Sequence, residues 1–121
     1  MNREIYDEMY HFDFSVRNYE TFEKETVLED EDGNAIDLSG KTAAGMVRTK
    51  PGASGDPVAV MVCEVDTSRG SVTFRLTSSQ TAAIEPGKYA YDVCLVESID
   101  GETIRKYIIG GALIVLPSVT H

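Results

Sequence analysis

Apolar side chains recur at every second position along most of this 121-residue chain, and this period restricts the fold more than any other feature. A period of two puts alternate side chains on opposite faces of a strand, whereas a helix needs a period of about 3.6. In the first such segment, Tyr10, Phe12, Phe14 and Val16 alternate with polar residues. Clusters of glycine, proline, aspartate and asparagine separate the segments, as turns require. The sequence therefore predicts an all-β protein.

The same pattern predicts seven strands and one helical turn. The strands are expected at residues 10–17, 21–28, 42–49, 58–65, 71–76, 88–98 and 102–116, the last with a bulge or bend at Gly110–Gly111. Between residues 79 and 85 the period changes, and Ser79 is expected to cap a single helical turn that Pro86–Gly87 ends. These elements predict one antiparallel β-sandwich or flattened barrel spanning residues 1–121, with an extended N-terminal arm at residues 1–9 left open.

Charge is distributed unevenly along the chain. Residues 1–40 hold twelve acids and three bases, so they account for the whole net charge of −9. An acidic surface repels phosphates and anionic lipids, so neither nucleic acid nor membrane is expected as a partner. The N-terminus also lacks the apolar segment of a secretory signal, and no apolar run is long enough to span a bilayer.

No group of residues predicts catalysis or metal binding. Neither His11 nor His121 is placed beside a serine or cysteine that it could activate. Cys63 and Cys94 lie inside strands without C-x-x-C spacing, which favours two buried free thiols over a disulfide or a zinc site. An acidic turn before residue 35 resembles a calcium loop, but Lys41 stands where the loop needs a bidentate glutamate. We expect a protein that is not an enzyme and holds no cofactor or metal.

Two predicted strands are apolar on both faces, which a half-exposed strand would not be. They are VAVMVCEV at 58–65 and GALIVL at 111–116. Such a strand is covered either by another part of the chain or by another subunit, and the sequence leaves both open. If a neighbour covers it, the candidate contact residues are Met61, Cys63, Val65, Leu113 and Val115.

Three motifs between residue 32 and the end of the sequence carry a resemblance to a known family. The first is a D-G-x-x-I-D-L-x-G turn, the second a T-A-x-I-x-x-G-x-Y-x-Y-D segment, and the third a closing D-G-x-x-x-R segment that ends in V-x-P-x-V-T. The residues that carry them are Asp37, Leu38 and Gly40; Thr81, Ala82, Ile84, Gly87, Tyr89, Tyr91 and Asp92; and Gly101, Arg105, Gly110, Val115, Pro117, Val119 and Thr120. Together they resemble the small β-sandwich domain of tailed-bacteriophage tail and baseplate proteins, in particular the N-terminal domain of phage baseplate upper proteins.

The resemblance implies a structural role in a phage particle. Family members often use this domain to attach a larger receptor-binding region, whereas this chain ends at the third motif. We therefore expect a non-enzymatic adaptor of the tail or baseplate, made in the bacterial host cytoplasm and built into the virion. Its expected partners are other virion proteins, including further copies of itself in a symmetric assembly. A capsid decoration protein and a carbohydrate-binding module for host recognition are the alternatives.

Overall fold

The chain folds into eight strands and one short helix in a computed structural model that describes residues 9–120. Residues 1–8, which hold most of the expected N-terminal arm, and His121 lie outside the described part. The elements are β1 (Tyr10–His11), β2 (Phe14–Arg17), β3 (Phe22–Val27), β4 (Thr42–Arg48), β5 (Ala59–Asp66), β6 (Ser71–Leu76), α1 (Ser78–Ala83), β7 (Gly87–Ile99) and β8 (Glu102–Leu116). The all-β class and the short helical turn are confirmed.

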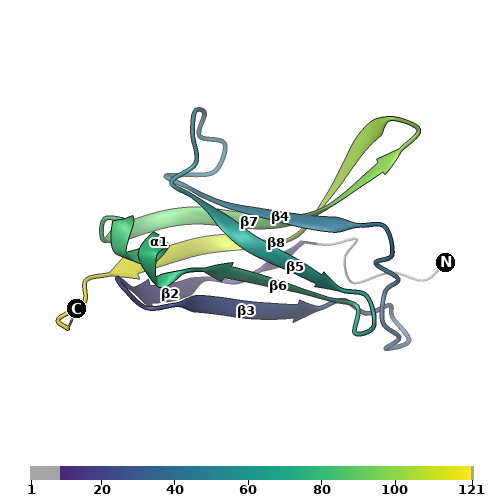
Figure 1. Cartoon of the computed structure of the whole chain (residues 1–121), viewed down its shortest axis with the longest axis horizontal. Helices are drawn as coiled ribbons and strands as arrows, with labels where there is room; N and C mark the ends of the chain where they lie inside the picture. The colour runs from purple at the N-terminus through teal and green to yellow at the C-terminus, as the bar shows by residue number, and fades with distance from the viewer. Residues whose placement is uncertain (1–8, 121) are drawn as a thin grey trace.

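The strands form one strongly curled sheet that stays open on one side. Their order is β1-β8-β7-β4-β5-β6-β3, and β2 also pairs with β8. Strand β5 joins the two halves, because residues 59–61 pair with β4 and residues 62–66 pair with β6. In Figure 1, β3 and β6 lie below β4 and β7, so the sheet resembles half of a barrel.

The first expected strand is two strands, and both run parallel to β8. Tyr10 pairs with Ile109 and Phe14 pairs with Leu113, but the two residues between the strands leave the ladder. There the carboxylate of Asp13 accepts a hydrogen bond from the backbone N–H of Ala112 at 2.8 Å. The expectation of an antiparallel sheet throughout was therefore wrong. Alternation assigns side chains to faces equally well in either direction, so it cannot reveal strand direction.

The bulge in β8 lies at Ile108 and not at the glycine pair where it was expected. Val93 pairs with Ile109 while the next residue, Cys94, pairs with Tyr107, so Ile108 has no partner on β7. An inserted residue shifts the alternation of a strand. Accordingly Ile108 and Ile109 are both buried, and Tyr107 on the other side of the bulge is 46% exposed.

The core lies on the concave inner face of the curled sheet and is rich in aromatic rings. Phe74 is fully buried, with Phe22 and Tyr91 each 6.2 Å away between ring centroids. Phe14 lies 5.3 Å from Phe22 and so bridges the gap between β2 and β3. Burying one such side chain stabilises the fold by roughly 1.5–3 kcal/mol. The inward-facing residues of β7 are buried or packed against this core: Tyr89, Tyr91, Val93 and Leu95.

Helix α1 is capped by Thr77, so the expectation that Ser79 caps it was wrong. The Thr77 side chain accepts from the backbone N–H of Gln80 at 3.2 Å, and the Gln80 side chain accepts from the backbone N–H of Thr77 at 2.9 Å. Such a reciprocal box satisfies two backbone donors at the start of a helix. At the other end, Asn18 donates to the carbonyls of Thr81 at 2.6 Å and Ile84 at 2.7 Å, which ties α1 to the turn after β2.

Strands β7 and β8 continue beyond the rest of the sheet as a projecting hairpin, here called the hairpin arm (residues 97–104). The last residue of β7 that pairs with β4 is Val96, so beyond it β7 and β8 pair only with each other among the described residues. At the base of the arm, Lys41 Nζ donates to the carboxylate of Glu97 at 3.2 Å. Its turn consists of Asp100 and Gly101, which have φ values of 52° and 82°. Both positive angles suit a two-residue hairpin turn. The arm projects clear of the body in Figure 1.

Candidate protein-interaction face

The convex side of the sheet, here called the outer face, is formed by β5, β4, β7 and β8. Residues paired across neighbouring strands point to the same side of a sheet. The register places Val60 beside Met46, Met46 beside Asp92, and Asp92 beside Gly110. This row crosses all four strands on the side opposite the core residue Val93.

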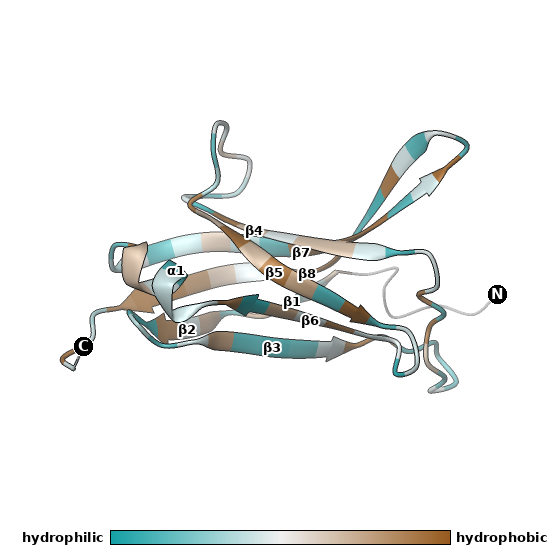
Figure 2. Ribbon diagram, in the orientation of Figure 1, coloured by the Kyte–Doolittle hydropathy of each residue, from teal (hydrophilic) through white to brown (hydrophobic). Residues whose placement is uncertain are grey.

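Much of the outer face is apolar and exposed. Val60 is 52% exposed and Val62 is 40% exposed, although β5 lies in the middle of the sheet. Parts of β5 are accordingly brown in Figure 2. The exposed large apolar side chains of this face are Met46, Val58, Val60, Val62, Tyr107 and Ile114. A cluster of this kind on one side of a small domain is typical of an interaction surface.

The five contact residues predicted from the sequence lie on the opposite, inner face. Met61, Leu113 and Val115 are buried, with exposed fractions of 4%, 0% and 1%. Cys63 and Val65 are partly buried and pack against the same core. The chain itself therefore covers this side of β5 and β8. The apolar side chains that a neighbour could still cover lie on the outer face and include Val60 and Ile114.

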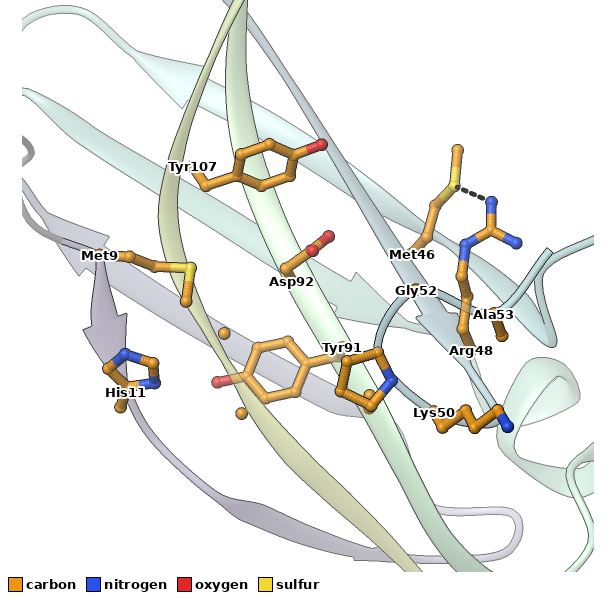
Figure 3. A pocket seen from close by; sticks show the side chains of 14 residues that line it. Met9, His11, Met46, Arg48, Lys50, Gly52, Ala53, Tyr91, Asp92 and Tyr107 are labelled. Carbon is orange, nitrogen blue, oxygen red and sulfur yellow. Dashed lines mark hydrogen bonds between the residues drawn. The ribbon is translucent and has the colours of Figure 1, made fainter.

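A shallow groove with a volume of about 600 Å³ crosses the outer face (Figure 3). Ala90, Gly110 and Gly111 form its floor and leave it flat, because they carry little or no side chain. The loop after β4 closes one side and the first residues of β1 close the other. The larger side chains that line the groove are Met9, His11, Met46, Arg48, Lys50, Tyr91, Asp92 and Tyr107.

Among the described residues that line the groove, Asp92 is the one acidic side chain. Partial burial raises the pKa of its carboxyl group, and the positive charge of Arg48 opposes that rise. The Arg48 guanidinium is held in place from the loop side, where it donates to the carbonyl of Gly55 at 2.7 Å. The side chain of Asp92 therefore faces outward from the sheet, on the same side as Met46.

Tyr91 passes beneath the groove from the core side. Its hydroxyl donates to the carbonyl of Phe12 at 2.7 Å. Burial raises the pKa of this phenol. No hydrogen bond joins His11 to Asp92 or to Tyr107 among the described residues. The groove therefore offers contact surface and charge, and its ionisable groups do not form a proton-transfer pair.

Both cysteines are free thiols. Cys94 is buried under the outer face, and Cys63 is partly buried on the inner face. Burial raises the pKa of Cys63 to about 11, so little thiolate is present near neutral pH.

Within residues 9–120, no three His, Cys, Asp or Glu side chains gather as metal ligands do. The same residues include no helix with the length and apolar character needed to cross a membrane.

Comparison with known proteins adds no family to these observations. Neither the family models nor the curated proteins that were compared with the chain match it.

Proposed function

We propose that this chain is a non-enzymatic structural protein of a tailed-phage virion, an adaptor in the tail or baseplate that acts through contacts with other virion proteins. The observation that carries the proposal is the exposed apolar outer face, centred on Val60 and Met46. The particle itself is inferred from the three sequence motifs. A decoration protein of the capsid would use the same face, and only its position in the particle would differ.

The composition of the outer face supports protein contact. Tyrosine, methionine and arginine are enriched in the buried centre of protein interfaces, and lysine and acidic residues are depleted there. Here Tyr107, Met46 and Arg48 surround the small residues of the groove, while Asp92 is the single acid among its described lining residues. A carbohydrate module would need several exposed rings, and of the described rings in the groove only Tyr107 is strongly exposed.

The finer architecture belongs to the same proposal. The curled sheet has the strand number of a small sandwich domain, but its two halves share β5 and one side remains open. We interpret it as a sandwich-type domain whose outer face is covered by a second protein layer in the particle. Covering apolar area contributes about 25 cal/mol per Å².

A particle-incorporation experiment tests this function. Phage particles assembled with the wild-type chain, with Val60→Glu or with the control Val27→Glu are purified and analysed by quantitative mass spectrometry. Val27 is 40% exposed on β3, away from the outer face, so the control makes a similar change elsewhere. We expect wild type and control in the particles, and at least a tenfold loss of Val60→Glu, about 1.4 kcal/mol. Particles without the wild-type chain, or with equal amounts of all three, would contradict the proposal.

A further inference from the structure

The hairpin arm meets the rest of the described chain at its base, where Lys41 Nζ donates to the carboxylate of Glu97 at 3.2 Å. Among the described residues, neither strand of the arm pairs with a third strand. Ile99 is 47% exposed and Ile104 is 41% exposed. A two-stranded hairpin with no further support is marginally stable in water. Packing against another surface would therefore both cover the two isoleucines and hold the arm in one position.

The tip of the arm is acidic. Asp100 and Glu102 flank the turn glycine, and no lysine or arginine occurs between Lys88 and Arg105. The turn at Asp100 has two successive positive φ angles, which fixes the direction in which these carboxylates and Ile99 are presented. The tip of the arm thus presents one apolar side chain, Ile99, beside two carboxylates, those of Asp100 and Glu102.

The groove has the complementary chemistry. Among the described residues that line it, Arg48 and Lys50 lie on the loop side and outnumber Asp92, while Met9 and Met46 provide flexible apolar walls. Methionine side chains adapt readily to an inserted apolar group. An acidic tip with an isoleucine matches this lining in charge and in polarity.

An arm cannot enter the groove of its own chain. Ile99 and Asp92 lie on the same strand, seven residues apart in the sequence, and at the usual rise this separates them by about 23 Å. Strand β7 is continuous between them, so the arm cannot fold back. The partner that supplies the tip must be a different molecule.

We propose that the hairpin arm of one copy of this chain inserts its tip into the outer-face groove of a second copy. The contact joins two different surfaces, so it is head-to-tail and repeats into a ring or a stack. It rests on the proposed function, since it names a second copy as one of the partners that cover the outer face.

Sedimentation velocity of the purified chain over a range of concentrations tests this contact. Two variants each disable one half of it: Ile99→Glu at the tip and Lys50→Glu in the groove. Their controls are Val27→Glu on β3 and Lys88→Glu, a base of β7 that does not line the groove. We expect wild type and controls to self-associate, and each test variant to bind itself at least about tenfold more weakly. Circular dichroism checks that every variant is folded.

Mixing the two test variants gives the sharpest result. The intact tip of Lys50→Glu should enter the intact groove of Ile99→Glu and form a one-to-one dimer that grows no further. A wild-type chain that stays monomeric up to about 1 mM, a concentration where even weak contacts are populated, would overturn the inference. So would self-association that neither variant changes, or a mixture that does not dimerise. A monomeric chain that still enters particles would overturn the self-contact alone and leave the proposed function standing.

Discussion

The close approach of the residues between β1 and β2 to the backbone of β8 depends on a single glycine. A Cβ built on Gly111 would collide with the carbonyl oxygen of Phe12 and lie 2.9 Å from the carboxylate of Asp13. The same carbonyl accepts the hydroxyl of Tyr91 from the core side. The absent side chain of Gly111 therefore lets the N-terminal segment lie flat against β8.

Replacing Gly111 with alanine is expected to destabilise the fold by about 1–3 kcal/mol, the usual cost of an overpacked site. Gly87→Ala is the matched control, because a Cβ there meets nothing closer than 3.7 Å. We expect the control to change stability by less than about 1 kcal/mol. Urea unfolding measures both values. Equal midpoints for the two variants would show that the contact between Phe12 and Gly111 tolerates a side chain.

In the groove, the fold shifts the pKa of the Asp92 carboxyl group. Its pKa in the folded chain is raised above the ordinary value of 3.8, first because the group is partly buried. A folded chain with a raised carboxyl pKa binds the proton more tightly than the unfolded chain does. Its stability is therefore greatest below the ordinary value and falls as the pH rises through the folded value.

Asp92→Asn removes this dependence, because an amide does not ionise. At neutral pH we expect the variant to melt at a higher temperature than wild type, and below pH 3.8 the two should melt alike. Thermal melts across this pH range measure the difference. A variant that is less stable at neutral pH would mean that the attraction between Asp92 and Arg48 outweighs the burial.

At the scale of elements, the sequence predicted strands better than their ends and caps. The period changed where α1 lies, but the serine favoured as its cap was the second residue of the helix. Thr77 has the same capping chemistry and also has a glutamine three residues on, which completes the box. The capping-box spacing was thus present in the sequence and would have identified the correct cap.

Thr77→Ala is expected to cost about 1 kcal/mol, and Ser79→Ala to cost less than half of that. The reason is that Thr77 accepts a backbone hydrogen bond at the start of α1, whereas no such bond involves Ser79. Chemical denaturation of the two single variants compares them directly. A larger loss for Ser79→Ala would place the cap at the residue that the sequence first indicated.

At the scale of the whole molecule, alternation assigned residues to two faces but could not say which face of a doubly apolar strand is the core. Val60 and Met61 are equally apolar, and only the curl of the sheet decides that Met61 is buried and Val60 exposed. For the same reason the five contact residues predicted from the sequence lie on the inner face of β5 and β8, which the chain itself covers. The groove was beyond prediction, because it combines the loop after β4 with residues of β1, β7 and β8.

The pairing of β2 with β8 has a consequence for how the protein is made. Phe14 leaves the ribosome early, yet its partner Leu113 is almost the last residue of the described chain to be synthesised. Contacts so distant in sequence form slowly, because the intervening chain must first be ordered. The pairing of β2 with β8 therefore cannot form until β8 has been translated. A ribosome stalled before β8 would hold a nascent chain with an unsealed aromatic core, which a chaperone could bind.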